Sequence, residues 1–136
     1  MDRQKDWEEG MTLFEKLLRR FVPFKEIGWE DIGEKFTRYA LIKNRWFALY
    51  LHQLDCLKWH PNCHDHPWSF CTLLIWPGYL EESGVGANYG IRWRKPGTVL
   101  YRPAEFSHNV VTPEGQSWSL VLTGPKKREW GFKQCA

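Results

Sequence analysis

The chain has 136 residues and a formal net charge of +3, so it has the length of a single domain and only a mild excess of positive charge. Its basic residues are scattered except within residues 92–95 and 126–128, which predicts solvated surface and argues against a nucleic-acid partner. No signal peptide opens the sequence, and no apolar run reaches the length of a membrane span. We therefore expect a cytoplasmic protein with no membrane partner.

Four cysteines occur, and we expect all of them to be free thiols: Cys56, Cys63, Cys71 and Cys135. A structural zinc knuckle is the alternative, because Cys56, His60, Cys63 and His64 lie close together in the sequence. Their spacing matches none of the common zinc fingers, so free thiols remain the preferred prediction.

Residues 6–21 have the pattern of an amphipathic helix. Six apolar side chains recur there at spacings of three and four: Trp7, Met11, Phe14, Leu17, Leu18 and Phe21. Lysine and arginine fill the last turn, and Pro23 ends the helix. We expect residues 1–36 to be a helix and linker that pack on a barrel formed by residues 37–136.

The rest of the chain reads as short strands separated by Gly and Pro. The predicted strands are 39–42, 46–54, 68–76, 79–82, 91–94, 98–102, 107–112 and 118–123. Short strands at regular spacing predict an all-β sandwich or barrel. The tail after Gly124-Pro125 carries two aromatic residues, Trp130 and Phe132, and is expected to pack on the outside.

Three histidines have the spacing of a metal site. His64 and His66 form an H-x-H pair, and His108 follows 42 residues later. Side chains at i and i+2 of a strand point to the same face, and a neighbouring strand can supply a third imidazole. The pattern therefore predicts a site in which His64, His66 and His108 hold one metal ion.

These histidines lie in two motifs that resemble those of the cupin superfamily. In the first motif, His64, His66 and Gly78 match, while Cys71 stands where cupins carry a glutamate. In the second motif Gly97, Pro103 and His108 match. The chain is also similar to a group of small bacterial and phage proteins with H-D-H-P-W and T-G-P-x-x-R-x-W-G-F signatures, found here at residues 64–68 and 123–132.

The resemblance implies a double-stranded β-helix, a cupin jelly-roll barrel, with an N-terminal α-helix and a divalent metal inside. Without the glutamate, three neutral histidines leave the ion its full charge and open positions, which suits an anionic, chelating substrate. Thiol dioxygenases resemble this arrangement with Fe(II), although their Ser-x-His-x-Tyr signature is missing here. Fe(II) is the preferred metal, and Zn, Ni and Mn are alternatives.

Other residues near the motifs are weaker candidates. Tyr101, Glu105 and Arg102 could steer or protonate a substrate. Cys71 is expected to be a buried apolar-like thiol, with a role as ligand or redox partner as the alternative. Asp65 lies between two inward-facing histidines and should face away from them. His52 could point into the barrel and is expected to be a hydrogen-bonded structural histidine.

The sequence therefore predicts a mononuclear metal enzyme, of the dioxygenase or isomerase class, that acts on a small polar or anionic molecule. The alternatives are a non-catalytic cupin that binds or senses a small ligand, and a phage-encoded protein that keeps only the fold. Exposed edge strands would permit a homodimer.

Overall fold

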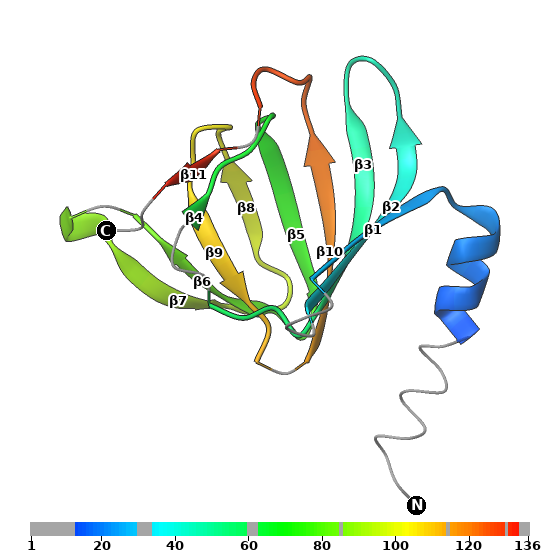
Figure 1. Ribbon diagram of the computed structural model, residues 1–136, viewed down its shortest axis with the longest axis horizontal. Helices are drawn as coiled ribbons and strands as arrows, with labels where there is room; N and C mark the ends of the chain where they lie inside the picture. The colour runs from blue at the N-terminus through cyan, green and yellow to red at the C-terminus, as the bar shows by residue number, and fades with distance from the viewer. Residues whose placement is uncertain are drawn as a thin grey trace, which may run out of the picture.

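The computed structural model describes residues 13–29, 34–59, 63–84, 86–113, 115–129 and 131–133, and it consists mainly of antiparallel strands (Figure 1). Residues 13–21 form the N-terminal helix. The first part of the predicted helix and the tail residue Trp130 lie outside the described residues. No helix within the described ranges is long and apolar enough to cross a membrane.

Two antiparallel sheets make up the barrel. The larger sheet has the order β1-β2-β3-β10-β5-β8, and the smaller sheet has the order β11-β4-β9-β6-β7. The strands of the larger sheet are β1 (Phe24–Trp29), β2 (Glu34–Lys43), β3 (Ala48–Asp55), β5 (Phe70–Trp76), β8 (Val99–Arg102) and β10 (Gln116–Thr123). Those of the smaller sheet are β4 (Cys63–His64), β6 (Tyr79–Ser83), β7 (Gly90–Arg94), β9 (His108–Val111) and β11 (Phe132–Lys133), with a short 3-10 helix η2 (Gly86–Asn88) before β7.

Most strands agree with the prediction, but the larger sheet begins earlier in the chain than predicted. Residues 24–29, expected to be part of a linker, form β1, and β2 starts at Glu34. β1 carries charged residues and a glycine, so its composition does not distinguish it from a loop. Pairing with β2 along its whole length defines β1 as a strand.

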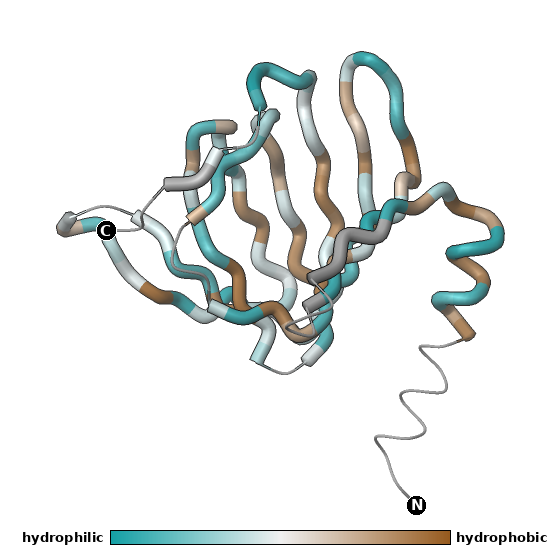
Figure 2. The backbone as a smooth tube through the Cα atoms, in the orientation of Figure 1, coloured by the Kyte–Doolittle hydropathy of each residue, from teal (hydrophilic) through white to brown (hydrophobic). Residues whose placement is uncertain are grey.

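The core lies between the sheets because apolar side chains alternate with exposed ones along the strands. In β5, Phe70, Thr72 and Leu74 are buried, whereas Leu73 and Ile75 are exposed. Figure 2 shows this change between apolar and polar segments along the central strands. Buried side chains from both sheets meet in the interior: Leu54, Leu74, Tyr79 and Leu100.

The N-terminal helix covers part of the outer face of the larger sheet, beside β1 and β2 (Figure 1). Leu18 and Val22 pack against a second buried cluster formed by Tyr39, Leu51 and Trp118. The helix therefore packs on the barrel, as its apolar stripe predicts.

The C-terminal segment lies across the loop that carries two of the histidines. We call residues 123–133 the strap. The strap includes β11, which pairs with β4. The backbone NH groups of Lys127 and Arg128 in the strap donate to the carbonyl of Pro67 at 2.7 and 3.2 Å. The Asp65 NH donates to the carbonyl of Gly131 at 2.9 Å. The two signatures at residues 64–68 and 123–132 are thus two halves of one contact.

Asp65 is the polar centre of this contact. Its side chain is fully buried and forms an ion pair with Arg128 at 2.9 Å. A Cβ on Gly131 would lie 2.7 Å from an Asp65 carboxylate oxygen, so only glycine leaves room there. Asp65 therefore faces the strap and not the histidines, as expected from its place between them.

Arg128→Ala should lower the free energy of unfolding by roughly 1–3 kcal/mol, because it removes a guanidinium from a buried carboxylate. Lys126→Ala is the matched control, since it breaks a strap ion pair whose partners are 59% and 83% exposed. That control should change the free energy of unfolding by less than about 0.5 kcal/mol. Urea unfolding of both variants measures the difference, and equal effects would contradict the role given to Arg128.

Candidate metal centre

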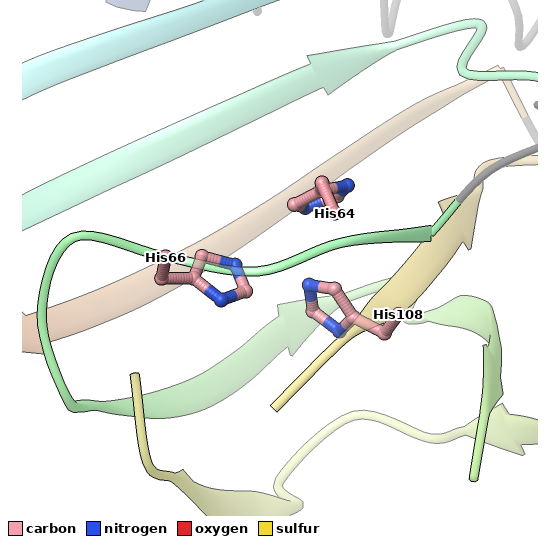
Figure 3. A group of neighbouring side chains, drawn as sticks. All are labelled: His64, His66 and His108. Carbon is pink, nitrogen blue, oxygen red and sulfur yellow. The ribbon is translucent and has the colours of Figure 1, made fainter. Parts of the chain in front are cut away.

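The structure brings His64, His66 and His108 together (Figure 3). His64 ends β4 and is paired in register with His108, the first residue of β9. The three ring centroids are 4.7 to 5.0 Å apart, and one nitrogen from each ring lies within 4.8 Å of the others. The predicted convergence of the three histidines is confirmed.

His66 reaches this group from a loop and not from the strand that the H-x-H pattern suggested. β4 ends at His64, and His66 is held by a backbone hydrogen bond from its NH to the carbonyl of Ala104 at 2.9 Å. Its ring also packs 4.4 Å from the ring of Phe70, on the inner face of the larger sheet. The side chains of His64 and His66 therefore point to the same place because the strap and these contacts hold the loop in position.

The spacing of the three nitrogens suits one metal ion. Three nitrogens bound to one ion at about 2.1 Å lie no more than about 3.6 Å from one another, so from a 4.8 Å spacing each nitrogen would move inward by less than about 1 Å. Within the described part of the chain, no cysteine or carboxylate adds a fourth atom to this group. The donor set is thus three imidazoles and leaves other coordination positions open.

Burial favours the neutral form of the His66 imidazole, which is the form that can bind a metal. His66 and His108 are only 6% and 5% exposed. Burial, reinforced by the charges of His108 and His64, lowers the pKa of His66 to about 2. His66 therefore keeps a free lone pair throughout the physiological pH range.

The sequence analysis missed Glu81, which supports His108 from inside the barrel. Glu81 lies in β6 and is 1% exposed. One of its carboxylate oxygens lies 2.8 Å from Nδ1 of His108, and the other accepts hydrogen bonds from Arg94 at 3.0 Å and from Arg102 at 2.7 Å. A carboxylate between an arginine pair and a histidine is a common support for a metal-binding imidazole.

These contacts keep Glu81 ionised. Burial alone would raise the pKa of its carboxyl, but the hydrogen bond with His108 and the charges of His108 and Arg102 outweigh burial and lower it to about 2. An ionised carboxylate only accepts hydrogen bonds, so Nδ1 of His108 carries the proton. When the His108 ring is neutral and keeps its proton on Nδ1, its Nε2 lone pair points away from Glu81 and could bind a metal.

Glu81 was hard to recognise from the sequence. The first cupin motif led to Cys71 as the position of the missing glutamate, and Glu81 sits beside Glu82 in a short strand. Alternation along β6, in which Tyr79, Glu81 and Ser83 are buried, was the available signal. A charged residue on the buried face of a strand suggests a paired interior group.

The structure does not bring Cys71, Tyr101 or Glu105 to the histidines. Cys71 is a free thiol on the outer face of β5, where it lines an apolar cleft with Leu73 and Leu122. Tyr101 is 65% exposed and faces outward, because Leu100 and Arg102 occupy the inner positions of β8. Glu105 is exposed on a turn. Of the predicted catalytic candidates, only Arg102 contacts the centre, through Glu81.

The cysteine predictions are partly wrong. Cys63 is disulfide-bonded, so the four cysteines are not all free thiols, whereas Cys56 and Cys71 are free. Cys56 is exposed and does not belong to the histidine group, so the structure gives no support to a zinc knuckle around it. His60 and Cys135 lie outside the described residues.

Comparison with known proteins places this fold. No family model and no curated protein matches the chain. A cupin 2 conserved barrel domain protein from Rhodopseudomonas palustris superposes with a TM-score of 0.64 at 11% identity, over 82% of this chain and 77% of that chain.

Two further solved structures carry names of enzymes. A chain described under the crystal structures of the DMSP lyases RdDddP and RnDddQII matches with a TM-score of 0.62 at 14% identity, over 83% of this chain and 63% of that chain. HppE in its Fe(II) form matches with a TM-score of 0.58 at 6% identity, over 76% of this chain and 57% of that chain. This chain thus spans less than two thirds of the length of these two. At such identities the likeness concerns the fold, and the chain accordingly has the cupin fold, a double-stranded β-helix.

Proposed function

We propose that the protein is a metal-dependent cupin enzyme that binds one divalent ion through His64, His66 and His108 and acts on a small polar or anionic molecule. The observation that carries this proposal is the convergence of three imidazole nitrogens within 4.8 Å, with His108 held by the buried Glu81. A buried carboxylate that orients a histidine ring is typical of metal sites, and packing alone would not require it.

The preferred metal is Fe(II), and the preferred reaction class is that of a dioxygenase, with an isomerase as the alternative. Imidazole ligands suit iron, zinc and nickel alike, so the ligand set by itself does not select among them. The Fe(II) form of HppE, whose fold resembles this one, supports iron. The DMSP lyases with the same fold act differently, so the barrel alone does not select the reaction.

A bound divalent ion would supply Lewis acidity and open positions for a substrate or for O₂. The protein's own residues supply the rest. Glu81 keeps the proton on Nδ1 of His108 and orients the ring. Arg94 and Arg102 hold Glu81 in the ionised state. Phe70 and Phe106 pack beside the imidazoles and make that side of the centre apolar.

The first test is metal content. Protein purified without a histidine tag and loaded with Fe(II) or Co(II) should hold about one ion per chain, and His64→Ala and His108→Ala should each abolish this binding. Cys56→Ala is the control, since its thiol is exposed and outside the histidine group. Elemental analysis after desalting measures the content. Wild-type protein without metal, or unchanged metal in both histidine variants, would refute the metal centre.

The second test separates an enzyme from a binding module. The Fe(II)-loaded protein should consume O₂ in the presence of a suitable small thiol, diketone or hydroxy acid, and His108→Ala should not. Oxygen-electrode measurements across such a panel provide the result. Tight binding of a panel compound without its conversion, under O₂ and under N₂, would favour the non-catalytic module instead.

Glu81→Gln should weaken metal binding by about 10- to 100-fold, because it removes the charge that supports His108. Glu82→Gln is the matched control on the same strand, since Glu82 contacts Tyr89 and Asn109 and not the histidines. Competition with a chromophoric chelator measures the affinity of both variants. Thermal unfolding without metal shows whether each variant is folded. Equal affinity of folded Glu81→Gln and wild type would contradict this role of Glu81.

A further inference from the structure

Arg38 and His52 form a polar pair on the inner face of the larger sheet. They are direct partners in the β2–β3 register, so their side chains share one face. Leu54, two residues after His52, packs in the core between the sheets, which identifies this face as the inner one. The pair therefore lies inside the barrel, on the sheet that packs against the histidines through Phe70.

Aromatic rings hold the guanidinium of Arg38 in place. Its central carbon lies 4.5 Å from the ring centroid of Tyr50 and 5.6 Å from that of Trp68. Trp68 belongs to the segment that carries His64 and His66, so Arg38 lies beside the loop of the metal centre. Contacts through the ring faces leave the N–H groups at the edge of the guanidinium available to an acceptor.

The other arginines near the centre already have carboxylate partners. Arg94 and Arg102 pair with Glu81, and Arg128 pairs with Asp65. Within the described part of the chain, Arg38 makes no ion pair, and its guanidinium lies over the two aromatic rings. Arg38 is thus a positioned cation whose N–H donors are not used by the described residues.

His52 adds a second unused polar group. Its Nε2 is buried and has no hydrogen-bond partner among the described residues, and its ring packs 4.7 Å from that of Phe36. Burial, together with the charge of Arg38, lowers the pKa of His52 to about 3, so the imidazole is neutral. A neutral imidazole can donate or accept one hydrogen bond at Nε2. Leaving such an atom unpaired is costly, which favours a ligand at this place.

We propose that Arg38 and His52 bind the carboxylate of a small-molecule substrate whose other end faces the three histidines. This inference rests on the proposed function and names its substrate class. The planar guanidinium matches the two oxygens of a carboxylate, and His52 supplies one further hydrogen bond. Arg38 carries one positive charge and His52 is neutral, so a monoanionic carboxylate suits the pair better than a phosphate dianion does.

The experiment compares glycolate and mercaptoacetate with glycolamide, the neutral analogue of glycolate, on the Co(II)-loaded full-length protein. Calorimetry gives the affinities, and the visible Co(II) spectrum shows whether the metal is reached. Arg38→Met keeps an apolar side chain between the rings and removes the donors. This variant should bind both carboxylates about 10- to 100-fold more weakly than wild type and should bind glycolamide with unchanged affinity. His52→Phe should weaken the carboxylates less.

Arg45→Met is the matched control. Arg45 also lies over an aromatic ring, 4.6 Å from the centroid of Trp46, but both residues belong to the exposed β2–β3 turn. The Arg45→Met variant should bind all three probes with wild-type affinity. Arg38→Lys, which keeps the charge and loses the planar fork, gives a second measurement if Arg38→Met does not fold, and it should weaken the carboxylates by a smaller factor.

The outcomes separate the two proposals. The role of Arg38 and His52 would be overturned if folded Arg38 variants kept their affinity for the carboxylates. It would also be overturned if they lost affinity for glycolamide and glycolate equally. Either result would leave the metal centre in place. Absence of Co(II) binding in wild type would overturn the proposed function, and the same calorimetry on the metal-free protein would then still decide the carboxylate site. Preference for methylphosphonate over the carboxylates would reject the carboxylate assignment.

Discussion

The hydrogen bond between Glu81 and His108 is the contact on which the centre depends. Glu81 is a charged residue in the barrel interior, and such a residue is stable there only because Arg94, Arg102 and His108 occupy its oxygens. Arg102 lies in the larger sheet, whereas Glu81, Arg94 and His108 lie in the smaller sheet. One carboxylate therefore ties the two sheets together and fixes an imidazole at the same time.

The loop between β4 and β5 depends on a second buried carboxylate. Asp65 points away from the centre and is held by Arg128 and by the backbone of Gly131. Because Asp65 stands between His64 and His66, its anchoring on the strap turns both neighbours toward the interior. The C-terminal strap thus acts on the centre without contributing any of its three imidazoles. This explains why the H-D-H-P-W and T-G-P-x-x-R-x-W-G-F signatures occur together in one chain.

Much of this architecture could be predicted from local sequence patterns. Period-two alternation and Gly-Pro turns predicted most strands, and the spacing of His64, His66 and His108 predicted their meeting. Contacts between distant segments could not be predicted. The partners of Glu81 lie 13, 21 and 27 residues away, and nothing in a local pattern relates them. Tyr101 was named as a candidate only because it lies near the second motif, and alternation along β8 turns its side chain outward.

Charge explains why an anionic substrate suits this barrel. Three neutral imidazoles would add no negative charge to a divalent ion, unlike a site that includes a carboxylate ligand. Among the described residues around the centre, Arg94 and Arg102 share a single carboxylate, Glu81, and Asp65 and Arg128 balance each other, while Arg38 lies over aromatic rings. With an ion bound, the interior would carry a surplus of positive charge at low dielectric, where such a surplus is costly. An anion that reaches both the ion and Arg38 would relieve it, which is the electrostatic argument for the proposed anionic ligand.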